Sequence, residues 1–372
     1  MRPASGAGPL AGLRVLELPA IGPVPHAAMV LADLGAEVLR VDRRAAAARL
    51  TDTPPTGPEP ILRGRTTVLA DLKDPAELAS VRRLAAAADV LIEGFRPGVA
   101  ERLGLGPEEC LAANPRLVYG RMTGWGQDGE LAPAAGHDLN YLSLTGLLDN
   151  IGRPGERSVP PLNLVGDFGG GSMLLLVGVL AALWERERSG QGQVIDAAMV
   201  DGASMLGALA WSMRAGGAWA PGRGRNLVDG SHPFYDTYLC ADGKQVAVAC
   251  LEPQFFAAMV ERLGVEPAEV PGQWDRDRWP ELRALLTRVF ASRTRDEWDA
   301  IYRGSDACVT PVLDFDEAVT DPHLHSRGTL VSPEGVDQPA PAPRFTRTPA
   351  ELPPPEVRAP DGLADAVATW ES

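Results

Sequence analysis

Few side chains in this sequence have an ordinary pKa near neutral pH, and one of the five histidines lies where acid–base chemistry is commonly placed. His137 stands between a Pro/Ala-rich loop and an apolar stretch, at the boundary between two expected elements. Sites are often built at such boundaries. His137 is therefore a candidate general acid or base, and the alternative is a structural capping role for the His137-Asp138 pair.

Asp167 is the second candidate, because it lies just before three consecutive glycines, residues 169–171, and an apolar stretch. Its simplest role is that of a helix N-cap. Three glycines at a helix start lower helix stability, which favours a function for them, namely close approach of a ligand to backbone N–H groups. The lysine and Ser/Thr of a P-loop are missing and the dinucleotide spacing fails, so an acyl group or an enolate suits this position better than a phosphate.

Basic residues gather in the N-terminal third, in a chain whose net charge is −14. Between Arg40 and Arg102 there are 11 Lys/Arg and 9 Asp/Glu. Most are expected on the solvated surface, but five fall at or just past expected strand ends, where open parallel sheets bind their ligands. Arginine there is well suited to hold phosphate groups. The five are Arg40, Arg43, Lys73, Arg96 and Arg102.

Other polar residues give weaker signals. Glu252 precedes a helix-like stretch, where an acid commonly complements the helix dipole. His323 and His325 have no cysteine nearby, and we expect no metal site. The net charge of −14 disfavours nucleic acid or a membrane surface as a partner. We expect a reduced, cytoplasmic protein without a disulfide framework, because its four cysteines are far apart: Cys110, Cys240, Cys250 and Cys308. We expect no secretory signal, because the N-terminus lacks a charged segment that leads into a long apolar core.

The elements that must position these residues follow an α/β pattern. A strand, a helix and a second strand within about 30 residues are typical of a parallel crossover. We therefore expect an α/β fold with an open, mostly parallel, Rossmann-like sheet. The expected strands are 13–18, 36–41, 67–72, 89–93 and 117–122, and the expected helices between them are 26–34 and 74–88.

The middle of the chain predicts two helices. The apolar run 169–183 is too short for a membrane span and ends in charged residues, so a buried helix over 169–187 is expected. Residues 195–214 are also helical by composition. A Gly-rich segment, 216–230, is interpreted as a linker.

The C-terminal half predicts a smaller α+β domain. It contains a hairpin over 235–249 and helix-like stretches at 252–263 and 280–304. Nine prolines between 331 and 372 favour extended chain on a surface over a core element. The predicted division is a large domain over 1–197, a linker over 198–234, the small domain over 235–319 and a return segment over 320–372.

Read in order from residue 10 to residue 328, several segments resemble the class III CoA-transferase superfamily, and within it the α-methylacyl-CoA racemase branch. Each segment alone is a weak signal, but the ordered set is specific. The segments are GAEVLRVDR (35–43), ADLK (70–73), EGFRPGV (93–99), RLG (102–104), GWGQ (124–127), GHDLNY (136–141), PLNL (161–164) and GQVIDA (192–197).

The resemblance implies an interlocked homodimer that acts on acyl-CoA in lipid metabolism, with a CoA-binding large domain and a small middle domain in each subunit. It implies that His137 and Asp167 are the two proton-transfer groups, with Asp138 beside them and Glu252 supplied by the partner subunit. The residues that it assigns to CoA contacts are Arg43, Ala70, Asp71, Leu72, Lys73, Gly94, Phe95, Arg96 and Arg102. Arg40, Gly136 and Tyr141 are further candidates for CoA binding.

The same resemblance leaves two branches to be distinguished. Transferases similar to formyl-CoA transferase use the position of Asp167 as a nucleophile and generally lack the histidine of the Gly-His-Asp segment. The presence of His137 favours racemisation of a 2-methylacyl-CoA through an enolate, without a metal or redox cofactor. The sequence departs from the racemases at Leu62-Arg63-Gly64 and in the Pro-rich segment 51–60, which lies near the expected CoA contacts.

Overall fold

The computed structural model describes residues 7–44 and 57–372 and divides the chain into two compact units. The first unit takes in the chain up to residue 145, residues 161–207 and residues from 328 to the end. The second unit consists of residues 146–160 and 208–327. Part of the Pro-rich segment 51–60, up to residue 56, lies outside the described residues.

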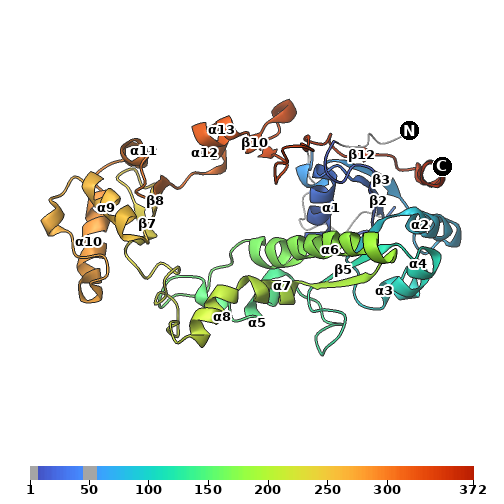
Figure 1. The fold of residues 1–372 in the computed structure, drawn as a ribbon, viewed down its shortest axis with the longest axis horizontal. Helices are drawn as coiled ribbons and strands as arrows, with labels where there is room; N and C mark the ends of the chain where they lie inside the picture. Colours follow the sequence, from blue (N-terminus) through green and yellow to red (C-terminus); the bar gives the residue numbers. More distant parts are fainter. Residues whose placement is uncertain (1–6, 45–56) are drawn as a thin grey trace. The chain divides into compact units, whose positions relative to one another are not determined.

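The first unit is built on one sheet of seven parallel strands, in the order β12-β3-β2-β1-β4-β5-β6. Figure 1 labels β2, β3, β5 and β12 of this sheet. The strand order reverses between β1 and β4, as in a doubly wound Rossmann-like sheet. The strands are β1 (Arg14–Glu17), β2 (Glu37–Asp42), β3 (Arg65–Leu69), β4 (Val90–Glu93), β5 (Val118–Thr123), β6 (Val194–Ala198) and β12 (Val357–Arg358).

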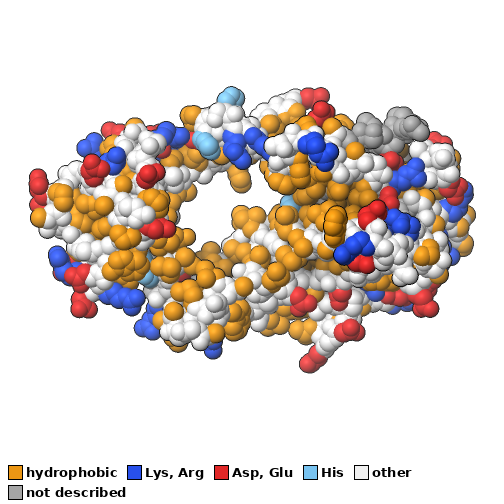
Figure 2. Space-filling model, viewed as in Figure 1, with side chains coloured by type: hydrophobic (Ala, Val, Ile, Leu, Met, Phe, Trp, Pro, Cys, Tyr) orange, Lys and Arg blue, Asp and Glu red, His pale blue; other side chains and the backbone are white. Residues whose placement is uncertain are grey.

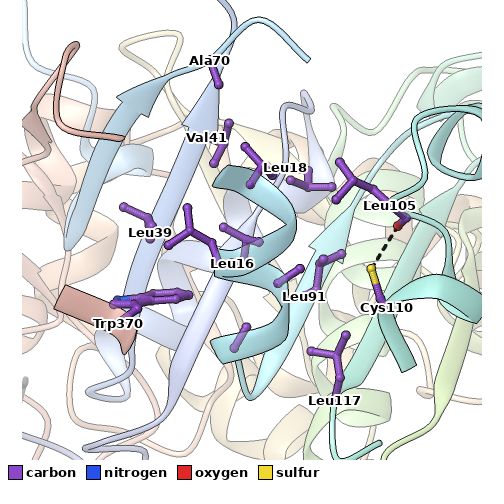
Figure 3. Close-up of a cluster of buried hydrophobic side chains, with 14 of the residues drawn as sticks. Leu16, Leu18, Leu39, Val41, Ala70, Leu91, Leu105, Cys110, Leu117 and Trp370 are labelled. Atoms are coloured by element: carbon purple, nitrogen blue, oxygen red, sulfur yellow. Dashed lines mark hydrogen bonds between the residues drawn. The ribbon is translucent and has the colours of Figure 1, made fainter. Parts of the chain in front are cut away.

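Helices cover both faces of this sheet and bury two separate hydrophobic clusters. One cluster packs the sheet against α2, α4 and α14, and Figure 3 shows Trp370 and Cys110 within it. The other packs the sheet against α1 and α6. The helices of the first unit are α1 (Pro23–Asp33), α2 (Pro75–Ala87), α3 (Val99–Arg102), α4 (Pro107–Ala113), α5 (Asp138–Leu144), α6 (Met173–Ser189), α7 (Met199–Leu206) and α14 (Leu363–Glu371), with 3-10 turns at Pro60–Leu62 and Pro333–Gly335 and a two-stranded ribbon of β10 (Leu330–Val331) and β11 (Gln338–Pro339).

A π-helix, η3 (Leu164–Ser172), leads directly into α6. It packs closely on α7, where a Cβ at Gly170 would lie 2.4 Å from the Ala203 nitrogen and a Cβ at Gly202 would lie 1.8 Å from the Gly170 oxygen. A side chain at Gly169 would also meet Leu206, at 2.8 Å. Close packing on α7, not ligand approach to the backbone, therefore explains the glycines at 169 and 170.

The second unit is α+β. The hairpin of β7 (Tyr235–Leu239) and β8 (Gln245–Ala249) pairs antiparallel with β9 (Val309–Pro311). The turn at Gly243 has φ +78°, the left-handed region that glycine adopts easily. The hydrophobic core of the second unit lies between this sheet and the helices α9, α10 and α11. The helices are α8 (Ala208–Ala215), α9 (Pro253–Arg262), α10 (Trp279–Phe290), α11 (Arg295–Tyr302), α12 (Phe315–Thr320) and α13 (Pro322–Arg327), with 3-10 turns at Leu148–Asn150, Pro267–Glu269 and Arg276–Arg278.

The α/β fold class, its parallel sheet and the hairpin are confirmed, and two local expectations are wrong. Residues 194–198 form strand β6 instead of the start of a helix, because they complete the sheet beside β5. The Pro-rich C-terminal segment does contribute to a core, because α14 follows its last proline and buries Trp370. Residues 146–160 group with the second unit, which no sequence feature indicated.

The helical run Leu164–Ser189 is long and apolar enough to pass a length-and-composition test for a membrane span. Its inner side packs on the sheet, with Leu175, Leu176, Val179 and Ala182 buried. Core helices of globular proteins pass the same test, so this feature gives weak evidence for a membrane span.

A buried ion cluster ties the first three strands together. The Glu17 carboxylate, at the end of β1, accepts hydrogen bonds from Arg40 of β2 and Arg65 of β3, each at 2.6 Å. The Glu17 and Arg65 side chains are fully buried. Removal of one member of such a cluster leaves buried charge without compensation.

We expect Glu17→Ala to lower the free energy of unfolding by about 3–5 kcal/mol, because two buried guanidinium groups lose their shared carboxylate. Urea unfolding measures this change. The matched control is Glu187→Ala, which removes an exposed ion pair with Arg116 and should change stability by about 0–1 kcal/mol. Equal losses of unfolding free energy in Glu17→Ala and Glu187→Ala would contradict a special role for the buried cluster.

Candidate active site

A pocket of about 320 Å³ opens at the carboxyl edge of the parallel sheet, entirely within the first unit. Loops after β1, β4 and β5 form part of its wall, at the point where the strand order reverses. This is where doubly wound sheets bind ligands. The lining residues are Ile21, Gly22, Pro23, Val24, Gly94, Phe95, Arg96, Pro97, Met122, Thr123, Gly124, Trp125, Ala132, Ala134, Ala135, Gly136, His137, Tyr141, Asp167 and Met199.

His137 lines this pocket from the N-terminal end of α5. It is the residue before the first helical position, and its backbone N–H donates to the Asn140 side chain at 3.1 Å. The backbone thus fixes the start of α5, while the residue itself remains exposed. An exposed imidazole at a pocket wall can exchange protons with a ligand.

Asp167 lines the same pocket from within η3. Its backbone N–H donates to the Asp138 carboxylate at 2.7 Å, and its own carboxylate accepts from the Asn163 amide at 3.4 Å. The left-handed Gly22 (φ +66°) lies opposite, where an added Cβ would be 3.1 Å from the Asp167 Oδ2. The carboxylate therefore sits in a narrow space between the first turn of α1 and η3.

The electrostatics of Asp167 favour proton transfer. Burial raises the pKa of Asp167, and the nearby Asp138 charge raises it further. The Asn163 hydrogen bond and His137 oppose this shift. A carboxyl group with a raised pKa can serve as an acid closer to neutral pH than an exposed one.

A buried carboxylate holds the turn after β4 that forms one pocket wall. Glu93 accepts the Phe95 backbone N–H at 2.6 Å and the Arg121 Nε at 3.1 Å. Arg121 also pairs with Glu101 at 2.8 Å. Burial raises the pKa of Glu93 to about 7. This network fixes the backbone of the Gly94–Arg96 segment and leaves Arg96 exposed beside the pocket.

Two aromatic residues form the wall next to His137. The Tyr141 hydroxyl donates to the Gly136 carbonyl, and burial raises the pKa of Tyr141 to about 12. Trp125 packs edge-on against Tyr141, with ring centroids 4.8 Å apart. The rings hold the Gly136-His137 backbone in place.

The structure brings some of the sequence-predicted residues together at the pocket and places others elsewhere. His137, Asp167, Gly94, Phe95, Arg96, Gly136 and Tyr141 line it. Asp138 lies behind it, buried, and contacts Asp167 through its carboxylate. Glu252 is an exposed residue at the start of α9, in the second unit.

The predicted CoA residues Arg43, Ala70–Lys73 and Arg102 follow or lie near the carboxyl ends of β2, β3 and β4, outside the pocket lining. Arg43, Asp71, Lys73 and Arg102 are exposed. Arg40 differs, because its buried guanidinium binds Glu17 and Asp42. These contacts favour a structural role for Arg40, and its contact with CoA stays a prediction.

Comparison with known proteins gives the family. The family model described as CoA-transferase family III matches residues 10–361. The chain belongs to this family. It is 46% identical to the α-methylacyl-CoA racemases of mouse and of human, over 92% of this chain and 87% of each relative. The crystal structure of a CaiB/BaiF family protein from Brucella suis superposes with a TM-score of 0.81 and 28% identity, over 98% of this chain and 100% of that one.

Sequence reasoning missed several residues that this CoA-transferase family III chain places at the site. Glu93, Trp125 and Asn163 lay within motifs that carried the family resemblance, but their roles depend on long-range contacts. Gly22 and the rest of the loop after β1 gave only a turn signal. Open parallel sheets bind ligands at the carboxyl ends of their strands, which indicated this edge of the sheet but not these particular residues.

We expect Asp167→Asn to make the folded protein more stable than wild type at neutral pH. The folded-state pKa of Asp167 is raised, so the folded chain binds this proton to a higher pH than the unfolded chain does. Wild-type stability therefore falls, relative to the variant, as the pH rises through the interval between the unfolded and folded pKa values.

Thermal unfolding of both proteins across a pH series tests this, and the advantage of the variant should shrink as the buffer is acidified. Asp128→Asn, at an exposed acid beyond β5, serves as the control. If the stability difference in favour of Asp167→Asn grew as the pH fell, the pKa of Asp167 would not be raised in the folded protein.

Proposed function

We propose that this protein is an α-methylacyl-CoA racemase that interconverts the (2R) and (2S) forms of a 2-methylacyl-CoA thioester. The observation that carries the proposal is that an imidazole, His137, and a half-buried carboxyl group of raised pKa, Asp167, line one pocket. Both groups belong to a chain that is 46% identical to racemases over most of its length.

The reaction exchanges one proton for another at a single carbon. One of the two groups takes the α-proton, and the electron pair moves onto the thioester oxygen to give an enolate. The other group then returns a proton to the opposite face of the carbon, and the enolate becomes a thioester again. His137 and Asp167 exchange these roles with the hand of the substrate. No atom changes oxidation state and both proton carriers are side chains, so the proposal needs no metal or redox cofactor.

The pocket wall suits such an enolate, because much of it is apolar. Ile21, Val24, Met122, Trp125 and Met199 are among its lining residues. In a dry site, developing negative charge interacts more strongly with the few polar groups that face it. The acyl chain of the substrate would contact the same apolar residues.

The CoA part of the substrate would lie along the same sheet edge. The exposed Arg96 is at the pocket, and Arg43, Lys73 and Arg102 follow the carboxyl ends of neighbouring strands. Arginine and lysine can hold the phosphates of CoA there. A substrate spanning this edge would place its thioester between His137 and Asp167.

Self-association as a homodimer, the arrangement implied by the resemblance, is part of the proposal. The outer side of α6 carries an apolar stripe at helical spacing, the α6 stripe: Met173, Val177, Leu180 and Trp184, which are 46%, 59%, 39% and 71% exposed. Hydrophobic side chains gather over α6 and α7 in Figure 2. Contiguous apolar surface of this kind marks association sites. In such a dimer, Glu252 of one subunit would orient His137 of the other. The proposed location is the cytoplasm, which suits four cysteines that form no disulfide.

We expect His137→Ala and Asp167→Ala each to lower racemisation by about 10²–10⁴-fold, the range for loss of a general acid or base. Proton NMR in D2O follows the α-position of (2R)- and (2S)-methylacyl-CoA. Wild type should convert both to the same mixture and introduce α-deuterium. His325→Ala, at an exposed histidine of the second unit, is the control and should retain full activity. Unimpaired exchange in both site variants would end the assignment.

The alternative is a CoA transferase in which the Asp167 carboxylate attacks the thioester, releases CoA as the thiolate and holds the acyl group as an anhydride. The family model itself is described by CoA transfer. A transferase requires a free carboxylic acid as acceptor, and hydroxylamine traps its anhydride. CoA transfer to an added acid, without α-exchange in its absence, would replace the racemase assignment.

We expect the wild-type protein to sediment at twice the 39.4 kDa of one chain, and Val177→Arg to shift it toward the monomer by placing a charge in the centre of the α6 stripe. Analytical ultracentrifugation measures both. Arg188→Glu, an exposed charge change near the end of α6, is the matched control. A monomeric wild-type protein, or an unchanged dimer in Val177→Arg, would contradict this interface.

A further inference from the structure

His26 is a titratable residue that the proposed reaction does not use, and it contacts the segment that carries Asp167. It belongs to the first turn of α1. Its ring stacks on Phe168, with centroids 4.3 Å apart and an interplanar angle of 18°. Its Nδ1 lies 2.7 Å from the Ser172 hydroxyl. Phe168 is the residue after Asp167, and Ser172 is the last residue of η3.

The hydrogen bonds of Ser172 determine the tautomer of His26. A serine hydroxyl has one hydrogen to donate, and Ser172 donates it to the Phe168 carbonyl at 2.9 Å. With the Ser172 hydrogen directed at Phe168, the Nδ1 of His26 carries a hydrogen and donates to the Ser172 oxygen. Burial lowers the pKa of His26, which favours the neutral ring with a single N–H.

The same contacts stabilise the π-helical register of η3. In an α-helix the Phe168 carbonyl would accept the Ser172 backbone N–H, but here the Ser172 hydroxyl takes that place. The carbonyl also accepts the backbone N–H of Met173, five residues on, and the Phe168 N–H donates to Asn163, five residues back. Local bonds from a serine hydroxyl compete with helical bonding in this way.

The π-register matters because it decides where the Asp167 carboxylate lies. The start of α1 contacts η3 through residues one turn apart, with Gly22, just before α1, against the Asp167 carboxylate and His26 against Phe168. A change from i→i+5 to i→i+4 bonding would rotate Asp167 relative to α1. π-helical segments are frequent at functional sites, where they place a side chain that a regular helix would direct elsewhere.

We infer that His26 is a positioning residue for Asp167, which acts by donating from Nδ1 to Ser172 and by stacking on Phe168. This inference rests on the proposed racemase function. It implies that loss of the His26–Ser172 hydrogen bond impairs the step carried by Asp167 and spares the step carried by His137.

The experiment measures exchange without inversion, that is, α-deuterium in the recovered starting enantiomer, for each hand of a 2-methylacyl-CoA in D2O. Each hand presents its α-proton to only one of the two bases. Asp167→Asn identifies the hand that depends on Asp167. His26→Phe retains an aromatic ring against Phe168 but cannot donate, and it should slow exchange of that same hand by about 10-fold, because small misplacements of a catalytic group are costly. Exchange of the other hand and the KM should stay unchanged.

Three further proteins complete the test. Ser172→Ala removes the contact with His26 together with the hydroxyl's own bond to the Phe168 carbonyl, so it should slow exchange of that hand at least as much as His26→Phe does. Adding His26→Phe to Ser172→Ala should cause no further loss, because the His26–Ser172 hydrogen bond is already gone. His26→Asn should recover exchange, since its amide nitrogen stands at the same number of bonds from Cβ as Nδ1.

The outcomes separate the two ideas. Suppose that Asp167→Asn abolishes α-exchange of one enantiomer, while His26→Phe and Ser172→Ala slow the exchange of neither enantiomer or of both equally. The proposed role of His26 is then wrong and the racemase assignment stands. If Asp167→Asn leaves both hands exchanging, the proposed function itself fails, and the inference fails with it.

Discussion

The hydrogen bond from the Asp167 backbone N–H to the Asp138 carboxylate, 2.7 Å long, joins the two segments on which the site depends. Asp138 directly follows His137, so this bond ties the start of α5 to the π-helix that carries Asp167. It also explains Gly166, because a Cβ there would lie 2.5 Å from the Asp138 oxygen. Thirty residues of chain separate the two acid–base groups, and one buried carboxylate brings their backbones together.

Among the carboxylates near the carboxyl edge of the sheet, Glu17, Glu93 and Asp167 have different partners. Glu17 binds the guanidinium groups of Arg40 and Arg65, and Glu93 binds Arg121. Within residues 7–44 and 57–372, no arginine or lysine lies within ion-pairing distance of Asp167. Burial favours protonation of a carboxylate and ion pairing opposes it, and at Glu93 burial outweighs Arg121 and raises the pKa to about 7. Asp167 differs from Glu17 and Glu93 in that it lines the pocket and has no ion-pair partner, so it is the one of the three that can exchange a proton with a ligand there.

The sheet and the two candidate residues that line the pocket, His137 and Asp167, could be predicted because those signals are local. Apolar runs such as 13–18 and 89–93 became β1 and β4, and His137 and Asp167 stood out by residue type and position. The strand 194–198 was missed because its pairing with β5 overrides a helical composition. Tertiary context likewise decided α14, whose Trp370 enters the core despite the prolines before it.

The π-helix shows why the site itself could not be derived in full. Gly169 and Gly170 signalled an unusual backbone, and the sequence favoured ligand approach as its cause, whereas the contacts show packing against α7. Gly170 and Gly202 approach so closely that neither can carry a side chain, although 32 positions separate them in the chain. The ring of His26, from α1, stacks on Phe168 of the same segment. Both α7 and α1 therefore pack directly on η3. The position of Asp167 is thus a property of how three segments pack, which no spacing within one of them encodes.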